Sequence, residues 1–366
     1  VVLLFAALCL YPAFTIVGRP GASITEARER IRAAVQSCGL TFPARRITVN
    51  LLPADLAKHG SFDLAMAVAV LGAAGIAPHV PRDVVHLGEL GLDGRVHPVR
   101  GVLPAVHAAV RAGYPRVVVP TGNVQEASLV PGAQVSGVDH LAGLIARYGG
   151  EVEVPHVAPT SQPEAQRDVA IPMDLADVLG QSEARFALEV AAAGGHHLFL
   201  VGPPGTGKTM LAARLPGLLP DLSEAEAVAV TSLHSVAGVF DPSAGLITRP
   251  PLEAPHHTAS PAAVIGGGSG IPRPGAASRA HLGVLMLDEA PEFGARVLET
   301  LRQPLESGEL VLDRAAGSAR YPARFQLVLA ANPCPCGLNT GKALDCTCSS
   351  IQRRRYLTQL SGPLPA

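Results

Sequence analysis

The chain has 366 residues, of which 48% are apolar, and its formal net charge at pH 7 is −1. This length allows roughly two or three domains with sizeable cores, and the composition excludes a disordered protein. A near-neutral chain has no overall positive field for holding nucleic acid. Any contact with DNA must therefore come from local basic patches or from a ring of subunits.

The first eleven residues, VVLLFAALCLY, are apolar and predict a buried strand. A membrane-spanning helix needs about 20 apolar residues, and a signal peptide has a basic leader and a small-residue cleavage site, so neither fits. No later run reaches membrane length, and the missing initiating Met suggests a fragment of a longer protein. We expect a cytoplasmic protein with no membrane partner, whose thiols stay reduced.

Residues 1–150 alternate short β-branched runs with Ala-rich stretches and predict a first domain of mixed strands and helices. Strands are expected at 44–52 and 114–120, and helices at 24–39 and 62–75, the second of them buried. Thr25 or Ser23 is placed to cap the first helix, and Gly39 to end it.

The Pro-rich, polar segment EVEVPHVAPTSQPEAQRD at 151–168 predicts a linker. The remainder, residues 169–366, predicts a second α/β domain. It opens with a helix at 182–195, a strand at 196–202, a Gly-rich turn and a further helix from Lys208.

The turn GPPGTGKT at 202–209 fits the pattern G-x-x-x-x-G-K-[ST] between an apolar strand and a helix, which makes a chance Gly-rich turn a poor explanation. Its backbone N–H groups and the helix N-terminus would bind the phosphates of ATP. Lys208, one of three lysines against 26 arginines, would bridge the phosphates, and Thr209 would hold Mg²⁺. The predicted nucleotide-binding residues are Gly202, Pro203, Pro204, Gly205, Thr206, Gly207, Lys208, Thr209 and Asp288.

Two further apolar runs predict strands that end in polar residues. GVLMLDEAPEF at 283–293 ends in Asp288, which would bind Mg²⁺ directly or through water, and in Glu289, which would polarise the attacking water. An acidic helix cap is the alternative explanation of that pair. FQLVLAANP at 325–333 ends in Asn332, whose amide would orient water or contact the γ-phosphate, unless it only begins an Asn-Pro turn.

Four of the six cysteines form two C-x-C pairs within fifteen residues: Cys334, Cys336, Cys346 and Cys348. Four thiolates would hold tetrahedral Zn²⁺ and staple the loop 334–348, which is too small to have a core of its own. Zinc sites more often use C-x-x-C, so a loop without metal remains the alternative. A redox pair is disfavoured because no helix begins after the first cysteine.

Taken in order, these motifs resemble the magnesium-chelatase-like AAA+ ATPases of the YifB/ComM type. The carboxyl half carries the resemblance in GPPGTGKTMLAARLPGLLPDL, APHHTASPAAVIGGG, GVLMLDEAPEF, LETLRQPLESGELVLDRAAGSARYPARFQLVLAANPCPCG and QLSGPL. The amino half carries it in PAFTIVG, ARERIRAAVQSCGLTFPARRITVNLLPADLAKHGSFDLAMAVAVL and LGELGLDGRVHPVRGVLPA, which resemble that family's amino-terminal domain, a relative of the Lon proteolytic domain.

The resemblance implies an α/β fold: a Lon-protease-like α+β domain, then a P-loop AAA+ module with a parallel sheet between helices. It implies a ring of identical chains, expected to be a hexamer, that binds and hydrolyses ATP with Mg²⁺. Catalytic roles are implied for Lys208, Glu289 and Asn332, the last as the sensor residue. Members of the ComM type act as DNA helicases in branch migration during natural transformation, so single-stranded or branched DNA is the expected partner.

The chain also departs from the family pattern. Members continue after SGPL with an Asp-Arg-Ile-Asp stretch and a helical lid, whereas this sequence stops at SGPLPA. The resemblance implies that this missing part carries the arginine that reaches a neighbour's γ-phosphate and the sensor arginine of the lid. Such an arginine finger raises turnover about 10³–10⁵-fold in other NTPases, so we expect this chain alone to bind ATP but hydrolyse it poorly. Glu253 stands where the family usually has an arginine. The Lon-like domain has Ser61 near the nucleophile position, but His107 and no lysine where the base should lie, so we expect no peptidase activity.

Two other functions stay open. A magnesium-chelatase motor subunit would drive metal insertion into porphyrin, but such subunits generally lack the Lon-like domain. A truncated fragment would bind nucleotide without efficient hydrolysis.

Two kinds of local feature could serve a DNA motor. The first is the basic stretches Arg45–Arg46, Arg296–Arg302 and Arg353–Arg355, for which plain solvated surface is the default interpretation. The second is a loop with His256 and His257, expected near the nucleotide or the pore.

Overall fold

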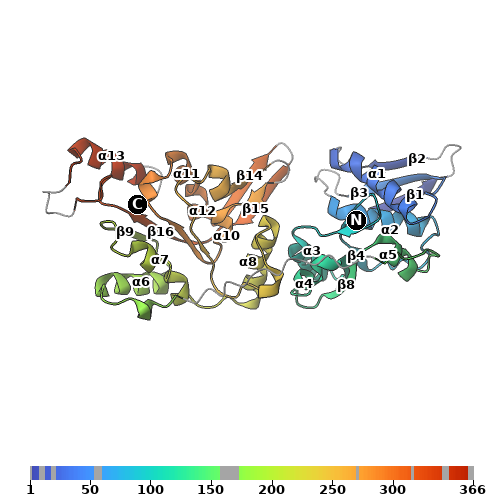
Figure 1. Cartoon of the computed structure of the whole chain (residues 1–366), viewed down its shortest axis with the longest axis horizontal. Helices are drawn as coiled ribbons and strands as arrows, with labels where there is room; N and C mark the ends of the chain where they lie inside the picture. The colour runs from blue at the N-terminus through green and yellow to red at the C-terminus, as the bar shows by residue number, and fades with distance from the viewer. Residues whose placement is uncertain are drawn as a thin grey trace. The chain divides into compact units, whose positions relative to one another are not determined.

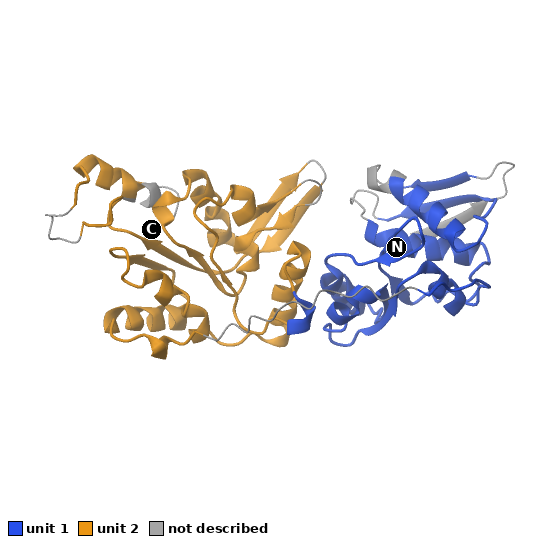
Figure 2. Ribbon diagram, viewed as in Figure 1, with its two compact units in different colours: residues 1–166, 241–245 blue, residues 167–240, 246–366 orange. Residues whose placement is uncertain are grey.

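The computed structural model of the chain describes residues 2–7, 13–17, 22–52, 60–156, 173–268, 272–314, 317–339 and 346–361. The chain divides into two units (Figure 2): Val1–Gln166 with Asp241–Gly245, and Arg167–Phe240 with Leu246–Ala366. The predicted linker at 151–168 lies outside the described residues from residue 157 onward.

The described residues of the first unit form three small sheets. The strands β1 (Val2–Ala7), β3 (Arg46–Leu51) and β2 (Ala13–Val17) lie in that order, with β1 antiparallel and β2 parallel to β3. The strands β4 (Val84–His86), β7 (Arg116–Pro120) and β8 (Gln134–Val138) are all parallel. The third sheet is the antiparallel pair β5 (Glu89–Leu90) and β6 (Val96–His97).

Helices of the first unit lie between and beside these strands (Figure 1). They supply most of the residues of its buried core. Their bounds are α1 (Ala22–Ser37), η1 (Gly60–Phe62), α2 (Asp63–Ala73), α3 (Val102–Arg111), η2 (Thr121–Asn123), α4 (Val124–Ala127) and α5 (Leu141–Arg147). Ile31 of α1, Leu71 of α2 and Leu144 of α5 are fully buried together with Val49 of β3. Amphipathic helices packed on half-buried strands produce this arrangement.

The helices and strands predicted at 24–39, 44–52, 62–75 and 114–120 are confirmed, with one correction. A strand is also present at Val2–Ala7, within the predicted strand at 1–11. α1 begins at Ala22, so Ser23 and Thr25 lie inside its first turn, and the prediction that either one caps the helix is wrong. Ser and Thr are common in first turns as well as at caps, and pattern alone does not separate the two positions. Gly39 does follow the helix end, with φ +75°, the left-handed conformation that glycine tolerates.

The second unit is built on one parallel sheet with the order β10-β13-β16-β9. Its strands are β9 (Leu198–Val201), β10 (Leu252–Glu253), β13 (Val284–Leu287) and β16 (Gln326–Ala331). Figure 1 labels β9 and β16, which lie side by side. Two antiparallel pairs accompany it: β11 (Gly266–Gly267) with β12 (Arg273–Pro274), and β14 (Glu309–Arg314) with β15 (Gly317–Pro322).

Alternate residues of β13 belong to two separate hydrophobic clusters. Leu285 and Leu287 pack in a cluster with α9 (Pro261–Ile265), α10 (Ala276–Arg279), α11 (Ala295–Thr300) and the strand β14. Val284 and Met286 pack in a cluster with α6 (Ser182–Gly194) and α7 (Lys208–Ala212). The sheet is thus covered on both faces, which confirms the predicted α/β fold and explains the unbroken apolar runs in its strands.

The remaining helices of this unit surround the same sheet or lead into it. They are η3 (Leu175–Asp177), η4 (Leu215–Leu218), α8 (Glu224–Ala237), η6 (Ala290–Glu292), α12 (Arg302–Ser307) and α13 (Ser350–Ser361); the short helix η5 (Pro242–Ala244) falls within the Asp241–Gly245 segment of the first unit. Within the residues that the structure describes, no helix is both long and apolar enough to cross a membrane.

A buried histidine stands at the end of β4. His86 is 7% exposed, and its Nε2 lies 2.8 Å from the hydroxyl oxygen of Tyr148, which follows α5. Burial lowers the pKa of His86 to about 4, from an ordinary value of 6.5, because the charged imidazolium would lose its hydration. The folded chain therefore holds this imidazole neutral.

The first unit should lose stability in acid because of this group. Below pH 6.5 the His86 imidazole binds a proton in the unfolded chain, but in the folded chain it stays neutral down to about pH 4. The free energy of unfolding therefore falls as the pH drops from 6.5 to 4, by up to about 3 kcal/mol. Hydrogen exchange of peptides covering β4 and β7 at pH 7 and pH 4.5, corrected for intrinsic rates, measures this loss. We expect His86→Gln to reduce it strongly, whereas His156→Gln, at an exposed histidine of the same unit, should leave it unchanged. Equal losses in all three proteins would contradict the assignment.

Candidate nucleotide-binding site

The Gly-rich turn predicted to bind phosphate joins the end of β9 to the start of α7. Gly205 and Gly207 have φ values of +78° and +80°, a conformation in which any side chain would be strained. Thr206 Oγ1 donates to the carbonyl oxygen of Pro203 at 2.8 Å, which closes the loop on itself. The loop is therefore shaped by its own backbone and ends at the N-terminus of α7.

Lys208, the first residue of α7, lies at the mouth of this loop. Its Nζ donates to the carbonyl oxygens of Gly202 at 2.7 Å and Pro203 at 2.9 Å, and to Oδ1 of Asn332 at 3.2 Å. Asn332 directly follows β16, the strand beside β9. The ammonium group of Lys208 thus connects the Gly-rich loop 202–207 to the predicted sensor residue Asn332.

Thr209, the second residue of α7, contacts Asp288, the first residue after β13. Thr209 Oγ1 donates to Oδ2 of Asp288 at 2.6 Å, and Oδ1 of Asp288 accepts the backbone N–H of Glu289 at 2.9 Å. A hydroxyl and a carboxylate oxygen are ligands that suit Mg²⁺, which usually takes one or two protein oxygens and keeps several waters. The donor set fits the ion that the sequence predicted there.

Glu289 has an unusual backbone and a specific partner. Its φ is +53°, which is uncommon outside glycine and is often found at functional sites. Its Oε2 lies 3.0 Å from Nδ1 of His257, an ion pair when the imidazole is protonated. The rings of His256 and His257 lie 4.1 Å apart. This agrees with the expectation that the histidine loop lies near the nucleotide site.

The Gly-rich loop and the polar residues that follow β13 and β16 line one cleft of about 410 Å³, a size typical of small-molecule sites. Its wall consists of Pro204, Gly205, Gly207, Lys208, Thr209, Met210, Asp288, Glu289, Ala331 and Asn332. Gly202, Pro203 and Thr206 do not line it but shape the loop through the hydrogen bonds given above. A neighbouring hollow shares Thr209, Asp288 and Glu289 and is also lined by His256 and His257.

The structure adds contacts that the sequence did not indicate. Gln181, at the start of α6, donates from Nε2 to the carbonyl oxygen of Thr206 at 3.1 Å and so supports the loop from outside. Glu253, where the resemblance led us to expect an arginine, accepts two hydrogen bonds from Arg279 at 2.9 and 2.7 Å. That pairing neutralises its charge. Neither partner could be found from local pattern because both lie far away along the chain.

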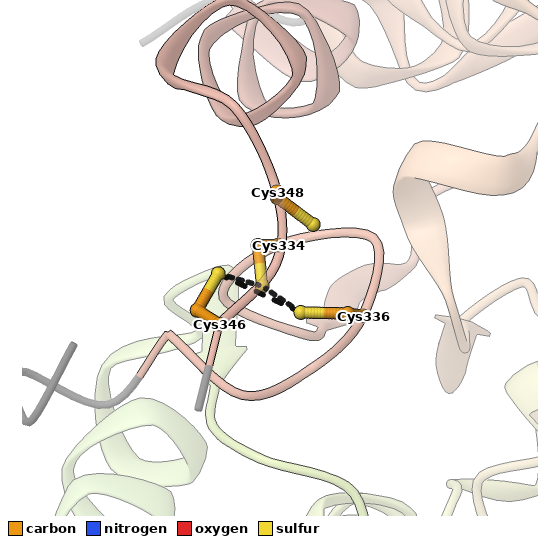
Figure 3. Close-up of side chains that lie close together, drawn as sticks. All are labelled: Cys334, Cys336, Cys346 and Cys348. Carbon is orange, nitrogen blue, oxygen red and sulfur yellow. Dashed lines mark hydrogen bonds between the residues drawn. The ribbon is translucent and has the colours of Figure 1, made fainter. Parts of the chain in front are cut away.

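The four predicted zinc ligands come together at the end of β16 (Figure 3). The sulfur of Cys334 lies 3.3 Å from that of Cys336 and 3.7 Å from that of Cys346, and the last two are 3.6 Å apart. Cys348 completes the group, in which all four sulfurs lie within 4.8 Å of one another. Hydrogen bonding from the backbone of Leu338 and from Cys334 lowers the pKa of Cys336 to about 6.

The basic stretches differ in how far their charges are satisfied locally. Arg302 pairs with Glu306 one turn later on α12, and Arg353 donates to Oδ1 of Asn339. Arg296, Arg354 and Arg355 are exposed, as are Arg45 and Arg46 in the first unit.

Two family profiles match the chain. The family described as magnesium chelatase, subunit ChlI, matches residues 174–366, more than half of the chain. The family described as subunit ChlI of Mg-chelatase matches residues 9–123. Together they cover parts of both units.

Curated relatives match nearly the whole chain. An uncharacterised protein of Mycobacterium tuberculosis is 56% identical over 96% of this chain and 69% of its own length. The uncharacterised protein YifB of Escherichia coli is 43% identical over 96% of this chain and 68% of its own length. The competence protein ComM of Haemophilus influenzae is 42% identical over 96% of this chain and 69% of its own length.

More distant matches cover less of the chain. A 38 kDa magnesium-chelatase subunit of Rhodobacter capsulatus is 30% identical over 43% of this chain and 49% of its own length. Lon protease 2 of Bacillus subtilis is 31% identical over 39% of this chain and 27% of its own length, in agreement with the expected Lon-like similarity. With its mixed α/β fold, its parallel sheets and relatives along nearly all of its length, the chain belongs to the magnesium-chelatase-like AAA+ family of the YifB/ComM type.

Proposed function

We propose that this chain binds ATP with Mg²⁺ and hydrolyses it, and that a ring of identical chains, expected to be a hexamer, uses the energy to remodel DNA. The observation that carries the nucleotide half is the convergence of five side chains on one cleft at the ends of β9, β13 and β16. They are Lys208, Thr209, Asp288, Glu289 and Asn332. In open α/β sheets this edge is where ligands bind.

Binding would use the loop 202–207 and the residues that follow it. The N–H groups of the loop and of the first turn of α7 would donate to phosphate oxygens, and Lys208 would add a full positive charge. Lys208 would exchange its bonds to the carbonyl oxygens of Gly202 and Pro203 for bonds to phosphate. Since the lysine already lies at the mouth of the loop, this exchange requires a side-chain movement only.

Hydrolysis would use the adjacent acidic pair. Thr209 and Asp288 would hold Mg²⁺, which supplies positive charge to the phosphates. Glu289 would accept a proton as the oxygen of water attacks the γ-phosphorus and the bond to the β-phosphate oxygen breaks, leaving ADP and inorganic phosphate. His257 holds the Glu289 carboxylate on the side of the cleft next to Thr209. Asn332 would contact the γ-phosphate and would remain next to Lys208, its hydrogen-bond partner.

The DNA half of the proposal rests on the resemblance to the ComM type and on exposed arginines. The match to the competence protein ComM extends over 96% of this chain. Arg296, Arg354 and Arg355 are exposed on the unit that contains the nucleotide cleft. Repeated around a ring, a modest patch provides enough phosphate contacts to hold a strand despite the near-zero net charge. The proposed setting is the cytoplasm, where ATP is available.

A chelatase motor is the second candidate. It is supported by the match to the 38 kDa magnesium-chelatase subunit, which extends over only 43% of this chain. The YifB and ComM matches extend over both units, so we favour the DNA motor.

Two variants separate binding from hydrolysis. Lys208→Ala should raise the Kd for ATP at least about 30-fold, since truncating a charged partner in such a site costs about 2 kcal/mol or more. Glu289→Gln should leave the Kd within about threefold and lower the single-turnover rate about 10²–10⁴-fold, as expected for loss of a general base. Calorimetry and single-turnover hydrolysis with excess protein measure both. Normal ATP affinity in Lys208→Ala would rule out this site.

The Mg²⁺ role of Thr209 is tested by an isosteric pair. Thr209→Val removes the hydroxyl and keeps the shape, so Mg²⁺ should no longer tighten ATP binding, a loss of at least about tenfold. Thr209→Ser keeps the hydroxyl and should retain the Mg²⁺ effect. The comparison uses ATP titrations with Mg²⁺ and with excess chelator. A Mg²⁺ effect that survives in Thr209→Val would show that Asp288 acts without this partner.

The partner is identified by what stimulates ATP turnover. Single-stranded or branched DNA should raise the rate in a salt-sensitive way, whereas a chelatase partner subunit with porphyrin should not. The triple change Arg296→Ser, Arg354→Ser and Arg355→Ser should abolish DNA stimulation and keep the basal rate. The control is Arg45→Ser with Arg46→Ser in the first unit. Stimulation by the chelatase partner alone would favour the second candidate.

A further inference from the structure

The sulfur positions in the cysteine group match the edges of a tetrahedral metal site. A zinc ion about 2.3 Å from four sulfurs at tetrahedral corners places those sulfurs about 3.8 Å apart. The separations of 3.7 and 3.6 Å are close to that value, and the whole group stays within 4.8 Å. Within the described residues this is the one group of three or more Cys, His, Asp or Glu side chains arranged to hold a metal ion.

The same separations disfavour other chemistry. A disulfide needs sulfurs about 2.05 Å apart, whereas the nearest pair here is 3.3 Å apart and all four residues are free thiols. A tetrahedral set of four thiolates selects zinc or iron–sulfur centres. An iron–sulfur cluster would place inorganic sulfide between the cysteines and spread them further. A single zinc ion fits the described spacing best.

The loop that carries the ligands has little else to hold it. Cys334 and Gly337 are its only buried residues among 333–339 and 346–349. The N–H of Gly337 donates to the carbonyl oxygen of Cys334 at 2.9 Å, so the first pair lies on a tight turn. Cys346 and Cys348 come from the far end of the loop, just before α13. A bridging ion would join the two ends and replace the missing core.

The turn at 334–337, which carries the first two ligands, directly contacts the Gly-rich loop 202–207. A Cβ at position 337 would lie 2.7 Å from Cδ and 2.9 Å from Cγ of Pro204, so Gly337 packs against Pro204 with no room for a side chain. Pro204 lines the nucleotide cleft. Asn332, which contacts Lys208, precedes Cys334 by two residues. The cysteine turn therefore lies against the cleft on two sides.

The second pair of cysteines leads into a capped helix. The backbone N–H of Ser349 donates to Oε1 of Gln352 at 2.8 Å, and Oγ of Ser349 accepts the N–H of Gln352 at 3.3 Å, a reciprocal capping box. α13 in turn contacts η6, which directly follows Glu289. The N-terminal end of the α13 dipole, two residues after Cys348, also favours the net negative charge of a four-thiolate zinc site.

We propose that Cys334, Cys336, Cys346 and Cys348 bind one structural zinc ion as thiolates, and that this site holds the Gly337 turn against Pro204 so that the phosphate-binding loop keeps its shape. Zinc displaces the remaining thiol protons as it binds, so acid should release it. The second half of this inference rests on the proposed function, because it assumes that the cleft binds ATP. The first half does not.

The metal half is tested by stoichiometry and spectroscopy. The full chain, purified with reductant and without chelator, should contain one zinc per chain by elemental analysis. Cys346→Ser should lose it, and Cys38→Ser, at a buried cysteine of the first unit, should keep it. Replacement of zinc by Co²⁺ should give the intense visible bands of tetrahedral thiolate coordination. Reduced, folded protein without metal, or with iron in place of zinc, would overturn the assignment.

The structural half is tested by a glycine pair that leaves all four cysteines in place. Gly337→Ala should keep one zinc and raise the Kd for ATP about tenfold, since a displacement of order 1 Å at one edge of a site has effects of this size or larger. Gly195→Ala imposes a similar backbone strain at φ +65°, but its Cβ meets nothing within 4 Å, so ATP binding should be unchanged.

The outcomes separate this inference from the proposed function. If zinc is bound but neither wild type nor any variant binds ATP, the proposed function fails and the metal site stands. If ATP binds equally well in wild type, Gly337→Ala and metal-free protein, the function stands and the support of the loop by zinc is wrong. Weakened binding in both Gly337→Ala and metal-free protein supports both.

Discussion

The candidate site depends above all on the register of three parallel strands. β16 lies between β9 and β13, with Ala331 opposite Val201 and Leu329 opposite Leu287. Gly202 and Asn332, each the first residue after its strand, are therefore level with each other, and the N–H of Gly202 donates to the carbonyl oxygen of Ala331 at 3.2 Å. A slip of one residue would turn Asn332 and Asp288 to the opposite face of the sheet.

The register is maintained by burial on both faces and by side chains below the site. β13 places Leu285 and Leu287 on one face and Val284 and Met286 on the other. A shift that exposed either pair to water would therefore lose buried apolar area. At the opposite end of β16, the buried Gln326 donates to the carbonyl oxygen of Ala191 at the end of α6. The strained backbone of Glu289 is tolerated because this framework over-determines it.

Asn332 and the cysteine group share one short segment, and this makes the end of β16 the most informative part of the chain. The segment 332–337 contacts Lys208 at its start and Pro204 at its end. Anything that fixes the position of this segment therefore affects the Gly-rich loop 202–207 at two points, Pro204 and the adjacent Lys208. The loop itself has no buried side chains of its own and is held by Gln181, by the turn at Gly337 and by its own carbonyl groups.

Local sequence alone determined the elements that have strong local rules. The strand–turn–helix around Lys208 and the apolar runs that end in Asp288 and Asn332 follow from periodicity and glycine chemistry, and the structure has them where the patterns place them. The grouping of four cysteines was also foreseeable, because both pairs flank one loop. The start of α1 was misplaced because Ser and Thr signal a cap and a first turn equally well.

Only the tertiary structure decided which distant side chains meet. The contacts of His257 with Glu289, of Glu253 with Arg279, and of Gln181 with the carbonyl of Thr206 join segments that no local pattern links. The packing of Gly337 against Pro204 is of the same kind. Periodicity reports which face of an element is buried, but the partner across that face depends on how strands are ordered in the sheet, which is a property of the whole chain.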